Sequence, residues 1–159
     1  MVDKNQAMIN YLITCPTILD SPLYFNFINA KNDTNQFVTI SSDLYTNRNY
    51  IDGSIGKEYS FTIMTFKSAT DIAVVKMEGF ENENISDMAT IQSLIDWISE
   101  QNENRNFPDF GEYCEVDRIY TTTDAPNFEG IDEQVSPPLV VYSTIIRVEY
   151  IDKSKIIWR

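Results

Sequence analysis

Five residues of one short acidic segment have the side chains best suited to chemistry. They lie in the stretch PDFGEYCEVD and comprise Asp109, Glu112, Cys114, Glu115 and Asp117. Carboxylate pairs act as general acid and base in glycosidases, and carboxylate clusters bind hard cations. However, nothing in the spacing fixes the separation of two carboxylates, and the calcium-loop pattern D-x-[DN]-x-[DN]-G is missing. We favour a solvated acidic surface, because a chain with 24 acidic residues produces such neighbours by composition alone.

Other catalytic arrangements are excluded by residue type. The chain has no histidine, which rules out Ser-His-Asp and Cys-His nucleophiles and His-based zinc sites. The acids beside Cys114 are expected to raise the pKa of its thiol, so we interpret it as a small buried strand residue. The glycines of DGSIG, at 52–56, fit a hairpin turn better than a phosphate-binding loop. We therefore expect no enzymatic activity, no cofactor and no catalytic, cofactor-binding or metal-binding residues.

Length and charge set further bounds. The 159 residues, 43% of them hydrophobic, are expected to form one domain over 1–159 with a buried core. The 24 acidic residues against 12 basic ones give a net charge of -12, which opposes binding to phosphates. No apolar stretch is long enough to cross a bilayer, and residues 1–20 lack a signal-peptide pattern. We expect a soluble, non-secreted protein in which Cys15 and Cys114 are free thiols in a reducing compartment.

Two segments have the periodicity of amphipathic helices. Residues 2–14 predict the first helix, with an apolar stripe of Ala7, Met8, Tyr11 and Leu12. Residues 85–101 predict the second, with an apolar face of Met88, Ile91, Leu94, Ile95 and Ile98 and a polar face of Asp96, Ser99 and Glu100. Trp97 lies one position off the second stripe. We interpret it as packing between helix and sheet, with a protruding contact as the alternative.

The remaining segments predict a sheet. Strands are expected at 37–41, after the DGSIG turn, at 114–122 and at 139–151. After the turn, Tyr59, Phe61 and Ile63 share one face. In the last strand one face consists of Val140, Tyr142, Ile146, Val148 and Tyr150, and the opposite face includes Ser143, Arg147 and Glu149. Residues 124–138 predict a long acidic loop. The order of elements favours an α+β fold in which two helices pack on one face of an antiparallel sheet of about four strands.

Four motifs, in this order, resemble a family of small tail proteins from phages of Gram-positive bacteria. They are MINYLITCP, YIDGSIGKEYSFTI, LIDWISEQNENRNFPDFGE and VVYSTIIRVEYID. Members of this family are described as minor capsid proteins or tail terminators. The resemblance covers most of the chain, and its most specific part is W-I-x-E-Q-N followed by P-D-[LF]-G-E, at residues 97–112.

The resemblance implies a structural virion protein and no catalysis. A tail terminator forms a homo-hexameric ring that caps the head-proximal end of the tail tube, stops its polymerisation and docks to the head-completion or neck protein. The tail sheath is a further partner if the tail is contractile. DNA passes through the ring without specific binding, and no membrane is involved. The expected location is the host cytoplasm during assembly and then the neck end of the virion tail.

Alternatives to the tail terminator remain open. The nearest is another head-tail joining or tail-completion ring protein of similar size and α+β make-up. More distant alternatives are a carboxylate-based cell-wall hydrolase and a monomeric binding module.

Two segments are candidate contacts in a ring. The first is the polar segment that follows the second helix, with candidates Arg105, Phe107, Asp109, Phe110 and Glu112. The second is a C-terminal extension at 153–159, with candidates Lys153, Lys155, Trp158 and Arg159. An acidic body and a basic, apolar tail supply the two different patches that a heterologous ring requires. Alternatively, the tail folds back as an edge strand or is disordered.

Overall fold

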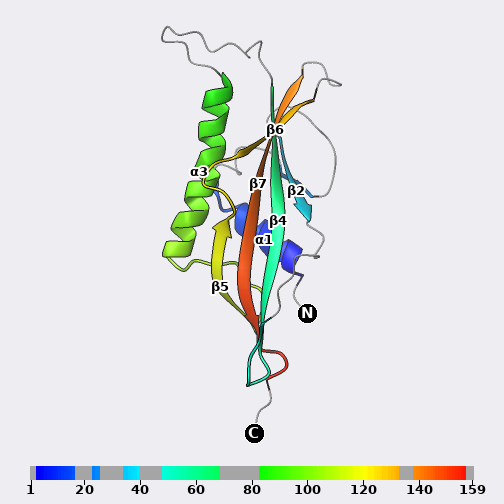
Figure 1. Cartoon of the computed structure of the whole chain (residues 1–159), viewed down its shortest axis with the longest axis vertical. Helices are drawn as coiled ribbons and strands as arrows, with labels where there is room; N and C mark the ends of the chain where they lie inside the picture. Colours follow the sequence, from blue (N-terminus) through cyan, green and yellow to red (C-terminus); the bar gives the residue numbers. More distant parts are fainter. Residues whose placement is uncertain are drawn as a thin grey trace.

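The computed structural model describes residues 3–16, 23–25, 34–39, 48–68, 83–132 and 138–156, with the side chains of 24, 25, 34, 36, 39, 68 and 83–90 left out. The protein has an α+β fold, as the sequence predicts (Figure 1). Its elements are α1 (Lys4–Leu12), β1 (Leu23–Phe25), β2 (Thr34–Thr39), β3 (Arg48–Asn49), β4 (Ile55–Ser68), α3 (Glu83–Glu103), β5 (Cys114–Thr121), β6 (Asn127–Asp132) and β7 (Leu139–Asp152).

The strands form one sheet with the order β1-β2-β4-β7-β5, to which β3 is added beside β4 and β6 beside β7. The described residues thus contribute seven strands, more than the four or so that the sequence predicts. Six of these strands are joined in antiparallel pairs, and β1 lies parallel to β2. The short strands β1 and β3, of 3 and 2 residues, are too brief to show an alternating pattern.

The pair β4–β7 forms the long axis of the molecule (Figure 1). The two strands are 14 residues each and pair without a register shift from Ile55 opposite Asp152 to Ser68 opposite Leu139. Phe61 lies directly opposite Ile146, and both side chains are fully buried. The face predicted for β7 is confirmed, since its five apolar members are all buried: Val140, Tyr142, Ile146, Val148 and Tyr150.

The other edge of β7 is shared by β5 and β6. Strand β5 pairs with the C-terminal half of β7, and β6 pairs with its N-terminal part. The prediction of a loop over 124–138 is therefore wrong for residues 127–132. The sequence NFEGID lacks the alternation of apolar and polar residues that indicates a strand. In the structure, a register shift between Phe128 and Gly130 interrupts the pairing with β7, and Gly130 has a φ of 131°. The strand is specified by the available edge of β7 rather than by its own pattern.

The main core combines residues of both helices with the sheet. Met8 and Leu12 of α1 belong to the same buried cluster as Leu94 and Ile98 of α3. The sheet contributes Phe37, Phe61, Ile63, Val116, Ile119, Ile146, Val148 and Tyr150 to this cluster. Phe37 stacks on Phe61 with ring centroids 4.4 Å apart. The core therefore extends across β2, β4, β7 and β5.

Both predicted helices are confirmed, with bounds that differ by about two residues. In α1, the Asp3 carboxylate accepts a hydrogen bond from the Asn5 N–H at 2.9 Å, which caps the first turn. In α3, the predicted apolar positions Ile91, Leu94, Ile95 and Ile98 are buried, and Asp96, Ser99 and Glu100 are exposed. The Met88 side chain lies outside the described residues. Among the described helices, none has the length and apolar character needed to cross a membrane.

Candidate subunit interface

The motif at residues 97–112 begins with a contact between the helices. The Trp97 ring lies against the Tyr11 ring, with centroids 5.1 Å apart and planes inclined by 51°. The Tyr11 hydroxyl donates a hydrogen bond to the carbonyl oxygen of Asn106 at 2.8 Å. Burial raises the pKa of Tyr11, and the charge of nearby Cys15 adds to the increase. Trp97 is half-buried against the main core, which confirms that it packs rather than protrudes.

A tight reversal follows the end of α3. Asn106 N–H donates to the Gln101 carbonyl at 2.9 Å, and Arg105 has a φ of 54°, in the left-handed region. The Arg105 guanidinium lies over the Phe107 ring, 5.3 Å from its centroid. The Phe107 ring packs in turn against the main core. We call residues 104–112 the elbow.

Phe110 has a different place from the one the sequence predicts. It is only 2% exposed and makes edge-to-face contacts with the rings of Tyr59 and Tyr150, at 5.7 and 5.3 Å between centroids. Phe110 is thus a core residue that attaches the elbow to β4 and β7, and it is not available as a surface contact. Asp109 and Glu112, on either side of it, are exposed. The residue pattern of the elbow contains no alternation that separates buried from exposed positions.

The acidic residues of the segment 108–117 are solvated. Asp109, Glu112, Glu115 and Asp117 are exposed, and the described residues contain no group of three or more ligands placed to hold a metal ion. The predicted direction of the Cys114 shift is correct, but its main cause is different. Burial raises the pKa of the thiol most, while the neighbouring charge of Lys4 lowers it. Both cysteines are free.

Residues 153–156 form a turn that packs beside the β3–β4 hairpin. Lys153 N–H donates to the Tyr113 carbonyl at 2.7 Å, and the Lys153 side chain forms an ion pair with Glu115. The hydrogen bond that the Lys153 ammonium donates to the Glu115 carboxylate is the main cause of the lowered pKa of Glu115. Lys155 is exposed. The remaining tail candidates, Trp158 and Arg159, lie outside the described residues.

The β3–β4 hairpin presents two residues that the sequence did not single out. Ile51 is fully exposed, at 107%, and Tyr50 is 45% exposed. Tyr50 N–H donates to the Ser54 carbonyl at 2.9 Å, and β4 begins directly afterwards, which confirms the predicted turn. The sequence signal that could have drawn attention to this exposed surface is an isoleucine inside a turn, where small and polar residues are usual. We call residues 50–54 the hairpin tip.

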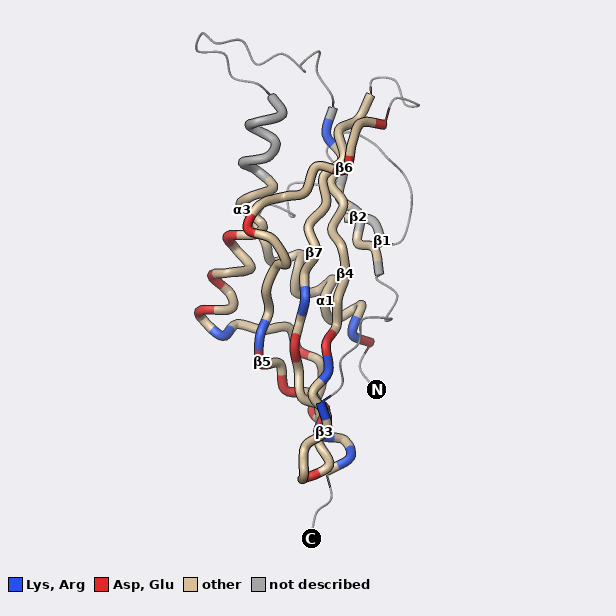
Figure 2. The backbone as a smooth tube through the Cα atoms, in the orientation of Figure 1, with Lys and Arg blue, Asp and Glu red and all other residues tan. Residues whose placement is uncertain are grey.

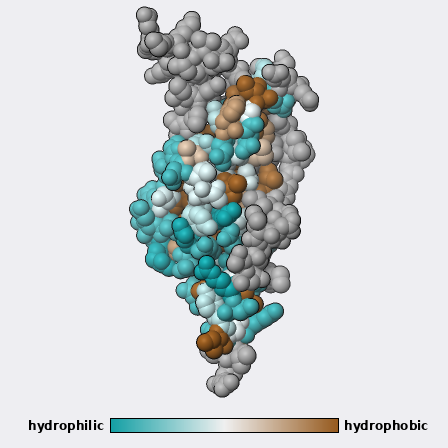
Figure 3. Space-filling model, in the orientation of Figure 1, coloured by the Kyte–Doolittle hydropathy of each residue, from teal (hydrophilic) through white to brown (hydrophobic). Residues whose placement is uncertain are grey.

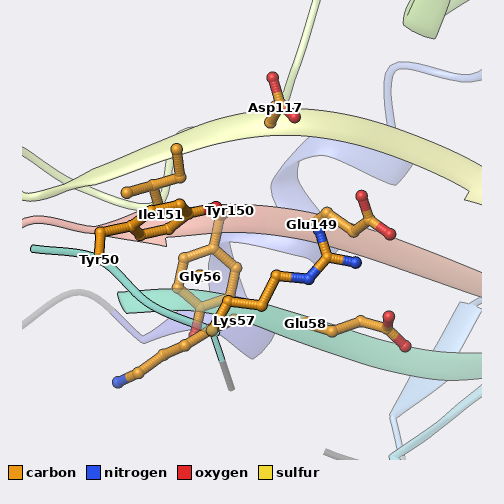
Figure 4. Close-up of a pocket in the computed structure, with 9 residues that line it drawn as sticks. Tyr50, Gly56, Lys57, Glu58, Asp117, Glu149, Tyr150 and Ile151 are labelled. Atoms are coloured by element: carbon orange, nitrogen blue, oxygen red, sulfur yellow. The ribbon is translucent and has the colours of Figure 1, made fainter. Parts of the chain in front are cut away.

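A small cavity lies between the hairpin and the sheet (Figure 4). Its volume is about 80 Å³, well below the roughly 300–1,000 Å³ of ordinary ligand pockets. Glu58 and Glu149 line it and face each other across β4 and β7. Arg147 Nε lies 3.5 Å from Glu58 Oε1, and Arg118 is paired in register with Glu149. The charge of Arg147 beside Glu58 reduces the repulsion between the two carboxylates.

A larger depression of about 400 Å³ lies between α1 and the elbow. Apolar side chains from both elements line it, namely Ala7, Tyr11, Phe107 and Pro108. Asp3 and Asp109 add two carboxylates, and Gln6 and Asn10 contribute polar groups. We call this depression the α1–elbow socket. It brings together two predicted candidates, Phe107 and Asp109, with helix residues that the sequence did not nominate.

No model of a known protein family matches this sequence, and no curated protein matches it.

Proposed function

We propose that this protein is a phage tail terminator whose subunits form a ring at the head-proximal end of the tail tube. The motif at residues 97–112, which resembles that of the family, is the observation that carries the proposal. Its residues occupy the junction of both helices with the sheet: Trp97 contacts Tyr11, and Phe110 contacts Tyr59 and Tyr150. Such contacts give a physical reason for aromatic residues at this spacing. The resemblance thus involves positions that determine the fold.

The packing also supports the architecture that the resemblance implies. We infer that α1 and α3 cover the same face of the sheet, because Leu12 and Leu94 share one buried cluster with Phe61 and Ile146. The opposite face of β7 then has Arg147 and other half-exposed side chains. On this face Arg147 and Glu149 are partly exposed, whereas Ser143 is covered by Glu129 of β6. We expect the exposed positions to contact other proteins of the tail.

The charge of the chain suits a conduit for DNA. The net charge is -12, and a negatively charged wall does not retain the phosphates of a passing duplex. A ring of such subunits offers passage without specific binding. The partners in this proposal are further copies of the chain, the tail tube protein and the head-completion or neck protein. The sheath is added in a contractile tail.

Tube assembly in the presence of the protein tests this proposal. Tail tube subunits should be polymerised with and without the purified chain and examined by electron microscopy, while light scattering gives the mass of the free protein. We expect a hexamer, and tubes of uniform length with a cap at one end. Tubes that are uncapped and as variable in length as those formed without the chain would contradict the proposal. Binding to the neck protein with no effect on tubes would instead favour another head-tail joining protein.

A further inference from the structure

We propose that the hairpin tip of one copy inserts into the α1–elbow socket of a neighbouring copy. This inference rests on the proposed ring and specifies the contact that builds it. The occupant of the socket is thus a second copy of this chain, with Ile51 as the inserted residue. The tip and the socket are different surfaces of the same subunit, so the contact is heterologous and repeats around a ring.

The tip has an apolar surface that the described part of its own subunit leaves exposed. Ile51 is 107% exposed and Tyr50 is 45% exposed. The hairpin lies at one end of the long axis, while α1 lies beside the middle of the sheet (Figure 1). Hydrophobic surface is visible at the hairpin end in Figure 3. A second molecule that covered this isoleucine would remove its apolar surface from water.

The tip is held in a defined conformation. The Asp52 carboxylate accepts hydrogen bonds from the Ser54 N–H at 2.9 Å and from its hydroxyl at 2.6 Å. Gly53 has a φ of 92°, and a Cβ at this position would lie 2.5 Å from the Lys155 carbonyl oxygen. The C-terminal turn therefore packs closely against the tip. A loop that is ordered before binding loses less conformational entropy when it binds.

The socket suits an aliphatic side chain. Ala7, Phe107 and Pro108 provide apolar contacts, and the volume of about 400 Å³ leaves room for Ile51 together with part of Tyr50. The socket is formed by α1 and the elbow, which are connected through the Tyr11–Asn106 hydrogen bond. Of its apolar lining, Ala7 and Phe107 are partly exposed, whereas Tyr11 and Pro108 are buried.

The unengaged charges beside the two surfaces are complementary: within the tip, the Asp52 carboxylate is held by hydrogen bonds from Ser54, and at the socket the Arg105 guanidinium lies over the Phe107 ring. Beside the tip, Arg48 of β3 and Lys155 of the C-terminal turn are exposed basic residues. Basic and acidic positions both occur at this end of the backbone (Figure 2). At the socket, Asp3 and Asp109 are exposed acids. Lys153 is not counted because it already pairs with Glu115. Opposite charges around an apolar contact favour this orientation of two identical chains over one that brings like surfaces together.

A pair of complementary variants tests the contact. Ile51→Asp disables the tip, and Asn10→Arg places a long cation at the rim of the socket; both positions are exposed. Each variant alone should sediment as a monomer under conditions in which the wild type forms a ring. Their mixture should give a heterodimer, since one intact tip and one intact socket remain. The mixture is measured well above the concentration at which the wild-type ring assembles, because a single contact lacks the avidity of a closed ring.

The matched control is Ile131→Asp, the same change at an isoleucine that is 52% exposed on β6. It should assemble like the wild type, and all three variants should retain the wild-type melting transition. An Ile51→Asp chain that still forms the ring, or a mixture that stays monomeric, would overturn the contact. If Ile51→Asp still forms rings that cap tubes, the contact is wrong and the proposed function stands. A wild-type chain that neither self-associates nor caps tubes would contradict both the contact and the proposed function.

Discussion

The rings of Tyr11 and Trp97 lie 5.1 Å apart and join helix α1 to helix α3. Strands β1 to β4 lie between the two residues in the sequence. Their contact therefore links distant segments and helps to position the helices and the socket between α1 and the elbow.

Replacing Trp97 by alanine should therefore destabilise the whole fold. The indole is half-buried against the main core, and loss of a large packed aromatic costs about 2–4 kcal/mol of unfolding free energy. Trp97→Phe keeps a ring near Tyr11 and should cost markedly less. Chemical denaturation followed by circular dichroism measures both values. Equal midpoints for the wild type and Trp97→Ala would show that this contact contributes nothing.

The two faces of β7 should respond differently to a new charge. Ile146 is fully buried in the main core, whereas the preceding residue, Ile145, is partly exposed on the opposite face of the strand. Ile146→Asp places an unpaired carboxylate in the core and should prevent folding. Ile145→Asp should stay soluble and melt cooperatively, with a loss of about 1–2 kcal/mol. If both variants folded equally well, the assignment of the faces would be wrong.

Ser143 shows that the opposite face is not uniformly solvated. Its side chain is only 6% exposed and donates a hydrogen bond to the Glu129 carboxylate of β6. The alternating pattern of β7 does not reveal this cover, because β6 comes from a segment that the sequence predicts to be a loop.

Gly53 should tolerate alanine worse than Gly130 does. Both residues have positive φ, at 92° and 131°, which disfavours any Cβ. A Cβ at Gly53 would also meet the Lys155 carbonyl oxygen at 2.5 Å, whereas one at Gly130 meets nothing within 4 Å. We expect Gly53→Ala to lower the unfolding free energy by roughly 1 kcal/mol more than Gly130→Ala. Thermal melts of the two variants check this difference, and a reversed order would rule out the close approach of the C-terminal turn.

Asp152 should link stability to acid pH. Hydrogen bonds from Ser154 and from the Lys57 ammonium hold its pKa well below the ordinary value of 3.8. A carboxylate whose pKa is lower in the folded state stabilises the fold above the unfolded pKa. This stabilisation is lost as the pH falls through the folded value. The difference in unfolding free energy between wild type and Asp152→Asn should thus be constant near neutral pH and shrink below about pH 4. Parallel stability curves down to about pH 2 would contradict this linkage.

The sequence alone determined the α+β class, the two described helices and the faces of the long strands. These features follow from local periodicity, because residues such as Ile95 in α3 and Phe61 in β4 repeat at the spacing of their own element. The hairpin turn at Gly53 was equally predictable, since glycine adopts its positive φ without strain. The resemblance of residues 97–112 to tail proteins also comes from the sequence alone, and it stays a prediction.

Only the tertiary structure decided which aromatic residues are core and which are surface. Phe110 and Phe107 lie three residues apart in a segment without regular structure, so no period assigns them to a side. Phe110 is buried because Tyr59 and Tyr150, distant in sequence, are brought together by the β4–β7 pairing. Strand β6 likewise depends on the free edge of β7, and the socket depends on α1 meeting the elbow. Long-range pairing has no local period, which is why these features emerge only in the fold.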